Sequence, residues 1–300
     1  MKPKIGAVIL NYRTWENTCE LAETFSKMGC IDKIVIIDND SPDNSADKIE
    51  FFLSKKHINK AIFFKSFDNV GYARGNNIGL KYLVEKERCD FCIVSNPDTI
   101  VDEKCVNNLI DTIISNNSFA ILTTTRRYSD GSKTSQYWDL PNINTILLER
   151  SYFYRRLSKM NYHYSVDYSK KINEIGAAPG SFFVIRSSVL KQVDYLDEET
   201  FLYFEENCLS QKIHKIGYKI GIITDSEYLI KKGEASTIAV KRTGAGMKHY
   251  IHSETHYVKS YLKPNILILS IYRLLNILMM FQGKFKATFL NLITGKATQK

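Results

Sequence analysis

The sequence predicts an α/β protein with a mostly parallel β-sheet flanked by helices. Short runs rich in Val and Ile alternate along the chain with stretches of helical periodicity, and such alternation is typical of a parallel sheet covered by helices. The chain has 300 residues, of which 44% are hydrophobic, so it can bury one large core. The same composition excludes a disordered or fibrous protein.

The first elements form a β-α-β unit, in which apolar runs at 4–10 and 33–38 flank a helical pattern at 15–28. We expect further strands at 61–65, 91–94, 120–123, 182–185 and 219–223. Further helical patterns lie at 44–55, 77–87, 102–114 and 205–216. The periodicity breaks down at about 126–175, which predicts an insertion over the site within a first domain at 1–240.

A C-terminal helical region is expected at 241–300. Its most apolar run, 266–281, is shorter than the roughly 20 residues that a membrane span needs, and Arg273 and Asn276 interrupt it. Lysines follow this run among apolar residues, a pattern typical of a helix that lies on a membrane surface. The alternative is a helix packed on the first domain or on a dimer partner, because an apolar helix face usually belongs to a core.

The net charge of +9 favours anionic partners such as nucleotides, sugar phosphates or an acidic membrane surface. The basic residues are spread along the chain rather than gathered with aromatic residues, so we expect no nucleic-acid partner. The six cysteines are too scattered for a disulfide framework, and the N-terminus lacks the apolar core of a signal peptide. These features predict a cytoplasmic protein with reduced thiols.

Polar residues follow each of the first four predicted strands, where ligands bind in sheets of this kind. The first strand ends in Asn11 without the Gly-rich turn of dinucleotide and P-loop sites, which argues against dehydrogenases and P-loop NTPases. Asp38 follows the second strand, where its carboxylate could hold a base or ribose. The segments 68–77 and 95–99 follow the third and fourth strands and add glycines, amides and carboxylates.

Together these segments resemble the family 2 glycosyltransferases with the GT-A fold, especially bacterial rhamnosyltransferase-like members that build capsule and O-antigen. The resemblance covers residues 4 to about 236. It rests on these segments in order: Val8-Ile9-Leu10-Asn11-Tyr12, Asp38-Asn39, Asn69-Val70-Gly71-Tyr72-Ala73-Arg74-Gly75-Asn76-Asn77, Asn96-Pro97-Asp98, Gly176 to Arg186, and Phe201 to Asn207.

The resemblance implies an enzyme that transfers a sugar from a UDP- or dTDP-sugar to an acceptor hydroxyl, with inversion at the anomeric carbon. The acceptor would be a lipid-linked saccharide at the inner face of the cell membrane, in the synthesis of a surface polysaccharide. The implied donor-binding residues are Asn11, Asp38, Gly71, Arg74, Gly75, Asn76, Asn96, Asp98 and Lys231.

Asp98 matches the last carboxylate of the family's Asp-x-Asp metal motif and is implied to hold Mg²⁺ or Mn²⁺, whereas Asn96 replaces the first. Both ions prefer oxygen ligands and can bind through one carboxylate together with phosphate oxygens and water. We expect the single carboxylate to weaken metal binding in the absence of nucleotide. Lys231 stands where a common family pattern has a histidine, and its ammonium could neutralise phosphate directly.

The acceptor hydroxyl must lose a proton as it attacks, and a carboxylate is the usual base. Glu206 falls where the family has its catalytic Asp, with Glu205 as the alternative. His249, His252 and His256 share one face of a predicted helix. His249 or His252 could contact the metal or phosphate in place of the missing family histidine. Alternatively, the three histidines could form a zinc cluster or be solvated or partly packed.

Two other functions stay open. A sugar-phosphate nucleotidyltransferase also has an α/β nucleotide-binding sheet, but it needs a Gly-rich basic loop after the first strand, and residues 11–16 contain no glycine. A non-catalytic nucleotide-sugar binder would explain why Asn96, Glu206 and Lys231 all depart from the family pattern. Loss of the Glu206 carboxylate would leave the function of such a binder unchanged.

Overall fold

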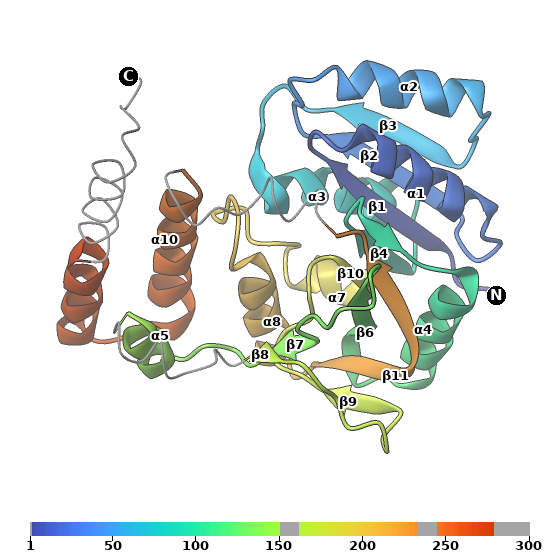
Figure 1. Cartoon of the computed structure of the whole chain (residues 1–300). Coiled ribbons are helices and arrows are strands. Elements are labelled where there is room, and N and C mark those ends of the chain that lie inside the picture. Colours follow the sequence, from blue (N-terminus) through green and yellow to red (C-terminus); the bar gives the residue numbers. More distant parts are fainter. Residues whose placement is uncertain (1, 151–161, 233–244, 279–300) are drawn as a thin grey trace.

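The computed structural model describes residues 2–150, 162–232 and 245–278, which form a central sheet with helices on both faces (Figure 1). The described strands of this sheet follow the order β3-β2-β1-β4-β10-β6-β11-β5, and β9 also pairs with β11. They are β1 (Ile5–Asn11), β2 (Lys33–Asp38), β3 (Ala61–Lys65), β4 (Phe91–Ser95), β5 (Thr99–Ile100), β6 (Phe119–Tyr128), β9 (Ile172–Glu174), β10 (Phe182–Arg186) and β11 (Lys219–Ile230). Strands β7 (Tyr137–Trp138) and β8 (Tyr162–His163) form a separate small sheet.

The strands β3-β2-β1-β4 are parallel throughout, as the sequence predicts. β10 runs antiparallel to both β4 and β6, whereas β6 and β11 are again parallel, so the complete sheet is mixed. Because β10 runs the opposite way, its first residue, Phe182, pairs with Ser95, the last residue of β4. The amino end of β10 therefore lies at the edge where the parallel strands end, which is where ligands bind in such sheets.

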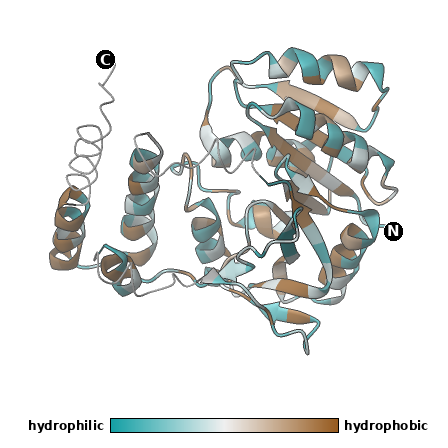
Figure 2. Cartoon of the chain, in the orientation of Figure 1, coloured by the Kyte–Doolittle hydropathy of each residue, from teal (hydrophilic) through white to brown (hydrophobic). Residues whose placement is uncertain are grey.

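The sheet is buried on both faces, which explains the continuous apolar runs of its central strands (Figure 2). In β1, Ala7 shares one core with Phe25, whereas Val8 shares the opposite core with Leu80. The described helices include α1 (Trp15–Lys27), α2 (Ser45–Lys55), α3 (Gly71–Lys81), the π-helix η1 (Tyr82–Lys86), α4 (Glu103–Ser115), α5 (Ile143–Glu149), α7 (Ser187–Gln192), α8 (Glu205–Lys215), α10 (Ala245–Tyr257) and the π-helix η2 (Val258–Leu262). Residues 266–278 are also helical.

Helix α3 begins at Gly71, earlier than the sequence predicts, so much of the expected polar loop is helical. Gly71 has a φ of +83°, a conformation that favours glycine, and the N–H of Tyr72 donates to the carbonyl of Phe201 at 2.8 Å. Glycine inside a helix lowers its intrinsic stability, which hides the start of α3 from a sequence pattern. A Cβ at Gly75 would lie 2.6 Å from the end of the Leu10 side chain of β1, so a larger residue would require that side chain to move.

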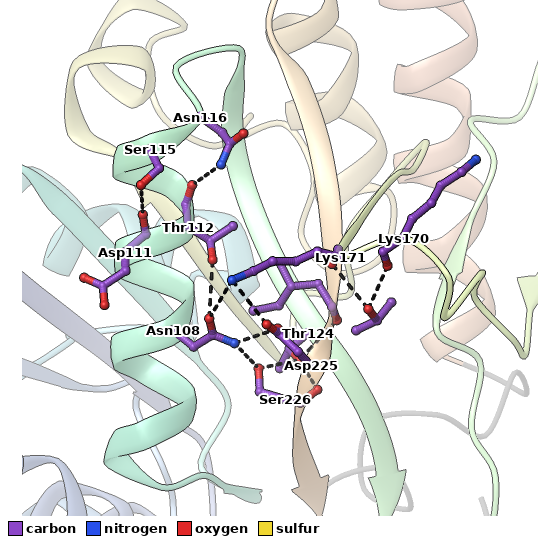
Figure 3. A network of polar contacts seen from close by, with 12 residues as sticks. Asn108, Asp111, Thr112, Ser115, Asn116, Thr124, Lys170, Lys171, Asp225 and Ser226 are labelled. Carbon is purple, nitrogen blue, oxygen red and sulfur yellow. Dashed lines mark hydrogen bonds and ion pairs between the residues drawn. The ribbon is translucent and has the colours of Figure 1, made fainter.

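A β-bulge interrupts β11 between Ile223 and Glu227, and a polar network surrounds it (Figure 3). Asn108 of α4 donates to Asp225 at 2.6 Å, and Asp225 also pairs with Lys171 at 3.2 Å. These contacts satisfy polar groups at a point where the ladder of backbone hydrogen bonds is broken. Beyond the bulge β11 resumes its parallel pairing with β6, and both strands are longer than predicted.

Because β6 extends to Tyr128, Arg126 belongs to the central sheet and faces Tyr228 of β11 in the strand register. β6 therefore overlaps the start of the predicted insertion at about 126–175. Its described part contains β7, α5, β8 and β9. Residues 151–161 of the predicted insertion lie outside the described residues.

The described C-terminal helices pack on the first domain. Tyr257 of α10 and Tyr272 share a small core with Cys208 of α8. The helical residues 266–278 also expose a set of apolar side chains (Figure 2), namely Ile266, Leu267, Ile271, Leu274, Ile277 and Leu278. Among the described helices, none is both long and apolar enough to cross a membrane. The lysines that follow at 284, 286, 296 and 300 lie outside the described residues.

Candidate active site

The carboxyl ends of β1 and β2 place Asn11 beside Asp38, which are paired in the strand register. The amide of Asn11 donates to Oδ1 of Asp38 at 2.6 Å, and the N–H of Ser41 donates to Oδ2 at 3.0 Å. Asn11 is itself oriented by Thr18 of α1, whose hydroxyl donates to its Oδ1 at 2.8 Å. Asn11 and Asp38 are fully buried, and their hydrogen bonds hold both side chains in place at the ends of β1 and β2.

Asn39 connects this pair to the start of α3. Its Oδ1 accepts a hydrogen bond from the N–H of Val70 at 3.1 Å, and its amide donates to Oδ1 of Asn69 at 3.0 Å. Gly71 follows, where a Cβ would lie 2.4 Å from the carbonyl oxygen of Phe201. The end of β2, the start of α3 and the segment before α8 thus meet at one place.

The other predicted donor residues of α3 have different environments. Arg74 donates from Nε to the carbonyl of Glu198 at 3.0 Å, so its described contact is with the loop before α8. Asn76 is buried and donates to the carbonyl of Tyr72 at 3.0 Å. Gly75 packs against Leu10, which accounts for the glycine structurally. The structure therefore places Gly71 beside Phe201, in the segment before α8, whereas Arg74 contacts Glu198 and Gly75 contacts Leu10.

The turn after β4 carries Asn96 and the buried Asp98. The carbonyl of Ser181, just before β10, accepts the N–H of Asn96 at 2.8 Å and the hydroxyl of Thr99 at 3.0 Å. The carbonyl of Asp98 accepts the N–H of Lys231 at 2.9 Å. The turn is therefore held between the amino end of β10 and the carboxyl end of β11.

The backbone of Lys231 is hydrogen-bonded to that of Asp98, but the side chain of Lys231 extends to α1. The ammonium donates to Oδ1 of Asn17 at 2.7 Å and pairs with Glu20. The predicted contact of this ammonium with phosphate would therefore compete with two partners on α1.

Glu205 and Glu206 begin α8, after two residues with left-handed backbone, Tyr203 (φ 71°) and Phe204 (φ 65°). Such a conformation is uncommon for non-glycine residues and persists where surrounding contacts impose it. The N–H of Gly180 donates to Oε1 of Glu206 at 3.1 Å. The turn before α8 thus aims Glu206 at the segment that leads into β10.

The two adjacent carboxyl groups differ in exposure and in the neighbouring groups that shift their pKa values. Glu205 is buried, and desolvation together with the charge of Glu206 raises its pKa well above the ordinary value. Glu206 is half-buried, and desolvation raises its pKa, while the N–H of Gly180 and the charge of Arg126 oppose that rise. A small cavity adjoins Glu206 and is lined on its other sides by residues that include Tyr72, Phe183 and Leu209. Of the pair, Glu206 is the more exposed group.

Arg126 is the functional candidate that sequence reasoning missed. It lies on β6, where Nη1 donates to the hydroxyl of Ser181 at 3.1 Å and Nε donates to the carbonyl of Ser135 at 2.6 Å. The hydroxyl of Ser181 is also 2.7 Å from that of Tyr228. A signal for Arg126 existed, because it follows a run of three threonines at the end of an apolar strand, as polar residues do at the other strand ends.

Gly180 and Ser181 join two of the predicted site residues, Asn96 and Glu206, to Arg126 and Tyr72. Ser181 bonds the Asn96 turn and Arg126, and Gly180 bonds Glu206 and accepts the hydroxyl of Tyr72 at 2.6 Å. Tyr72 lies at the start of α3, next to the residues that Asn39 contacts after the end of β2. The segment before β10 is therefore the common support of the candidate site.

The three histidines of α10 do not act as one cluster. The ring of His249 stacks on Phe201 with centroids 4.2 Å apart. His256 instead pairs through Nε2 with Asp197 at 2.7 Å. The contacts of His249 and His256 agree with the alternative that these side chains are partly packed.

Comparisons with known proteins define the class to which this fold and site belong. The structure of the mannosyltransferase PcManGT from Pyrobaculum calidifontis, in complex with GDP-Man and Mn²⁺, aligns over 98% of this chain and 80% of that one, with a TM-score of 0.56 and 12% identity. S. aureus TarS in complex with UDP aligns over 90% of this chain and 70% of that one, with a TM-score of 0.54 and 14% identity. The fold is accordingly that of the GT-A glycosyltransferases.

The family follows from the sequence match. The family model described as glycosyl transferase family 2 matches residues 7–194, and the chain therefore belongs to that family. Among curated proteins, the low-salt glycan biosynthesis hexosyltransferase Agl10 of Haloferax volcanii is 23% identical over 206 residues. That alignment covers 69% of this chain and 60% of the relative, so the match spans less than two thirds of the relative's length. Family and fold agree with the sequence prediction.

Proposed function

We propose that this protein is an inverting glycosyltransferase that moves a sugar from a nucleoside-diphosphate donor to an acceptor hydroxyl. The observation that carries the proposal is the Gly180-Ser181 backbone, which bonds Glu206 on one side and the turn of Asn96 and Asp98 on the other. In an inverting transfer the nucleophile and the leaving group lie on opposite faces of the anomeric carbon. Glu206 as the base and the Asn96 turn as the diphosphate-binding element contact neighbouring residues of one segment, Gly180 and Ser181, and this arrangement suits that requirement.

Glu206 would accept the proton of the acceptor hydroxyl. It is the more exposed of the two adjacent carboxyl groups, and it is fixed by the N–H of Gly180. Burial and the neighbouring charge of Glu206 both disfavour the ionised form of Glu205 and raise its pKa, which makes it the poorer candidate for the base. The division of roles between two adjacent carboxyl groups then follows from their environments.

Asp98 and Asn96 would hold the divalent cation, with Arg126 as a fixed positive charge nearby. A carboxylate oxygen and an amide oxygen on one turn suit Mg²⁺ or Mn²⁺, and the solved mannosyltransferase with this fold contains Mn²⁺. A bound cation would offset the charge that develops on the departing diphosphate. Arg126 adds a second positive group, held in place by Ser135 and Ser181.

Asn11 and Asp38 would hold the base of a UDP- or dTDP-sugar. A carboxylate has more acceptor sites than the two protein donors at Asp38 use, so a movement that exposes its buried oxygens would let it also accept the ring N–H of a pyrimidine. The UDP complex of the TarS structure supports this choice of base. Gly71, Gly75 and Asn76 would shape the adjoining wall of the donor site.

We further infer that the acceptor is a lipid-linked saccharide at the inner face of the cell membrane, in capsule or O-antigen synthesis of the rhamnosyltransferase-like type. The exposed apolar side chains of 266–278 and the net charge of +9 suit an anionic membrane surface. Co-sedimentation with anionic lipid vesicles should be lost when Leu267 and Leu274 are both replaced by serine. Concentration-dependent dimers without vesicle binding would instead assign this face to a second copy of the chain.

The central test compares Glu206→Gln with the matched control Glu205→Gln. Thermal shifts with UDP-, dTDP- and GDP-sugars, with and without Mn²⁺, identify the donor, and acceptor-dependent release of the nucleoside diphosphate measures transfer. Glu206→Gln should bind donor normally and lose transfer by roughly 10²- to 10⁴-fold, the usual contribution of a general base. Full activity in this variant would refute the assignment of the base. Donor binding by the wild type without transfer to any acceptor would favour the non-catalytic binder.

A further inference from the structure

A second group of potential metal ligands lies beside the C-terminal helices, away from the Asn96 turn in the sequence. Asp197 comes from the loop before α8, Cys208 from α8 and His256 from α10. One ligand atom of each lies within 4.8 Å of those of the other two. Three segments far apart in the chain therefore bring a carboxylate, a thiol and an imidazole to one point.

The three side chains are enclosed rather than scattered on the surface. Cys208 is fully buried, and the side chains of Asp197 and His256 are 14% and 19% exposed. Oδ2 of Asp197 is 2.7 Å from Nε2 of His256 and accepts the hydroxyl of Tyr261 at 2.5 Å.

Contacts on the far side of two of these groups orient them toward the cluster. The N–H of Glu199 donates to Oδ1 of Asp197 at 3.1 Å, which leaves Oδ2 directed at His256. The hydroxyl of Ser260 lies 3.4 Å from Nδ1 of His256, which leaves Nε2 directed at Asp197. Hydrogen bonds to the remote atoms of a ligand are the usual way in which proteins orient metal-binding histidines and carboxylates.

The chemistry of the cluster distinguishes between metals. A thiolate, an imidazole nitrogen and a carboxylate oxygen together suit Zn²⁺, whereas Mg²⁺ and Mn²⁺ favour oxygen ligands alone. We propose that Asp197, Cys208 and His256 form a Zn²⁺ site, with Tyr261 or a water molecule in the fourth position. On binding, Cys208 would lose its thiol proton to solvent, and neutral His256 would carry its proton on Nδ1, toward Ser260.

Zn²⁺ at this point would join α10 to the two elements that support the candidate active site. Cys208 lies on the helix that begins with Glu205 and Glu206. The loop of Asp197 contacts α3, because Asn77 donates to the carbonyl of Leu196 at 3.0 Å. The ion would therefore hold the C-terminal helices, α8 and α3 in one fixed arrangement. This inference does not depend on sugar transfer.

Metal binding by the full-length protein tests the proposal directly. Purified wild-type chain should retain zinc in elemental analysis, and titration of the metal-free chain with Co²⁺ should produce the absorption of a thiolate-to-cobalt charge transfer. Cys208→Ser should lose that absorption, whereas Cys19→Ser, which changes a buried cysteine outside the cluster, should keep it. Asp98→Asn should also keep it, which separates this site from the cation proposed at the Asn96 turn.

Three results would overturn the proposal. The first is a folded wild-type chain, checked by circular dichroism, that binds neither Zn²⁺ nor Co²⁺ and shows no rise in Tm with Zn²⁺. The second is an unchanged cobalt absorption in Cys208→Ser. The third is loss of bound Zn²⁺ in Asp98→Asn, measured by elemental analysis, with retention in Cys208→Ser, which would place the metal at the other site. In any of these cases the cluster is a hydrogen-bonded link between helices and not a metal centre.

Discussion

The N–H of Gly180 donates a hydrogen bond to Oε1 of Glu206 at 3.1 Å, and a Cβ at position 180 would lie only 2.6 Å from that same oxygen. The same Cβ would be 2.9 Å from the hydroxyl of Tyr72. Glycine at this position therefore allows the backbone to approach Glu206 closely enough to orient its carboxylate. The position of the proposed base on α8 therefore depends on the residue at position 180, just before β10.

Gly180→Ala should displace the Glu206 carboxylate and lower kcat, with little effect on donor binding. A misplacement of about 1 Å can cost on the order of 10²-fold in rate, and we expect a loss of that size. Gly29→Ala is the matched control, because its Cβ would meet its nearest neighbour at 3.4 Å, an ordinary contact. Steady-state kinetics with both variants checks the prediction. Equal kcat values for Gly180→Ala and wild type would contradict it.

Removal of the Arg126 charge should shift the pH dependence of transfer. Burial raises the pKa of Glu206, and the guanidinium of Arg126 counteracts that rise, so its loss should raise the pKa further. The ascending limb of kcat/KM against pH should therefore move to higher pH in Arg126→Gln, and activity at neutral pH should fall. Arg126→Lys keeps the charge and should restore much of the wild-type profile. A limb that stays in place in Arg126→Gln would show that this charge does not act on the base.

A second carboxylate at the metal turn should strengthen cation binding. Asn96→Asp restores the Asp-x-Asp pattern, so the Mn²⁺ concentration for half-maximal transfer should fall, most clearly at low donor concentration. Asn117→Asp adds the same charge at an exposed position and serves as the control. Kinetic titration with Mn²⁺ measures the effect. If both variants respond to Mn²⁺ as the wild type does, the Asn96 turn is not the cation site.

Two variants separate the possible roles of Lys231. If its ammonium serves the diphosphate, Lys231→Met should raise the KM for donor by about tenfold, the value of one charge-assisted hydrogen bond. Glu20→Gln removes the ion-pair partner on α1 and should leave that KM unchanged or lower it. Because the side chain of Glu20 is 66% exposed, either change should alter the free energy of unfolding by less than about 1 kcal/mol. Equal effects of both variants on KM would assign Lys231 to the contact with α1 alone.

Much of the site could be predicted because strand ends are visible in the sequence. Apolar runs locate the strands, and parallel strands bring their polar ends to one edge, as found for Asn11 and Asp38. The start of α3 was missed because its glycines weaken the local helical signal, while contacts with Leu10 and Phe201 hold that helix in place. Arg126 was missed because the length of β6 depends on its pairing with β11 after a bulge.

The sequence alone determined the family, the α/β class, the order of the elements and the polar character of the strand ends, because burial periodicity and short motifs are local properties of the chain. The tertiary structure alone decided that β10 runs antiparallel, and hence that Gly180 and Ser181 lie between Glu206 and the Asn96 turn. It also decided that Lys231 faces α1 and that His256 meets Asp197 and Cys208. Strand direction and side-chain partners depend on contacts between distant segments, and no local pattern encodes them.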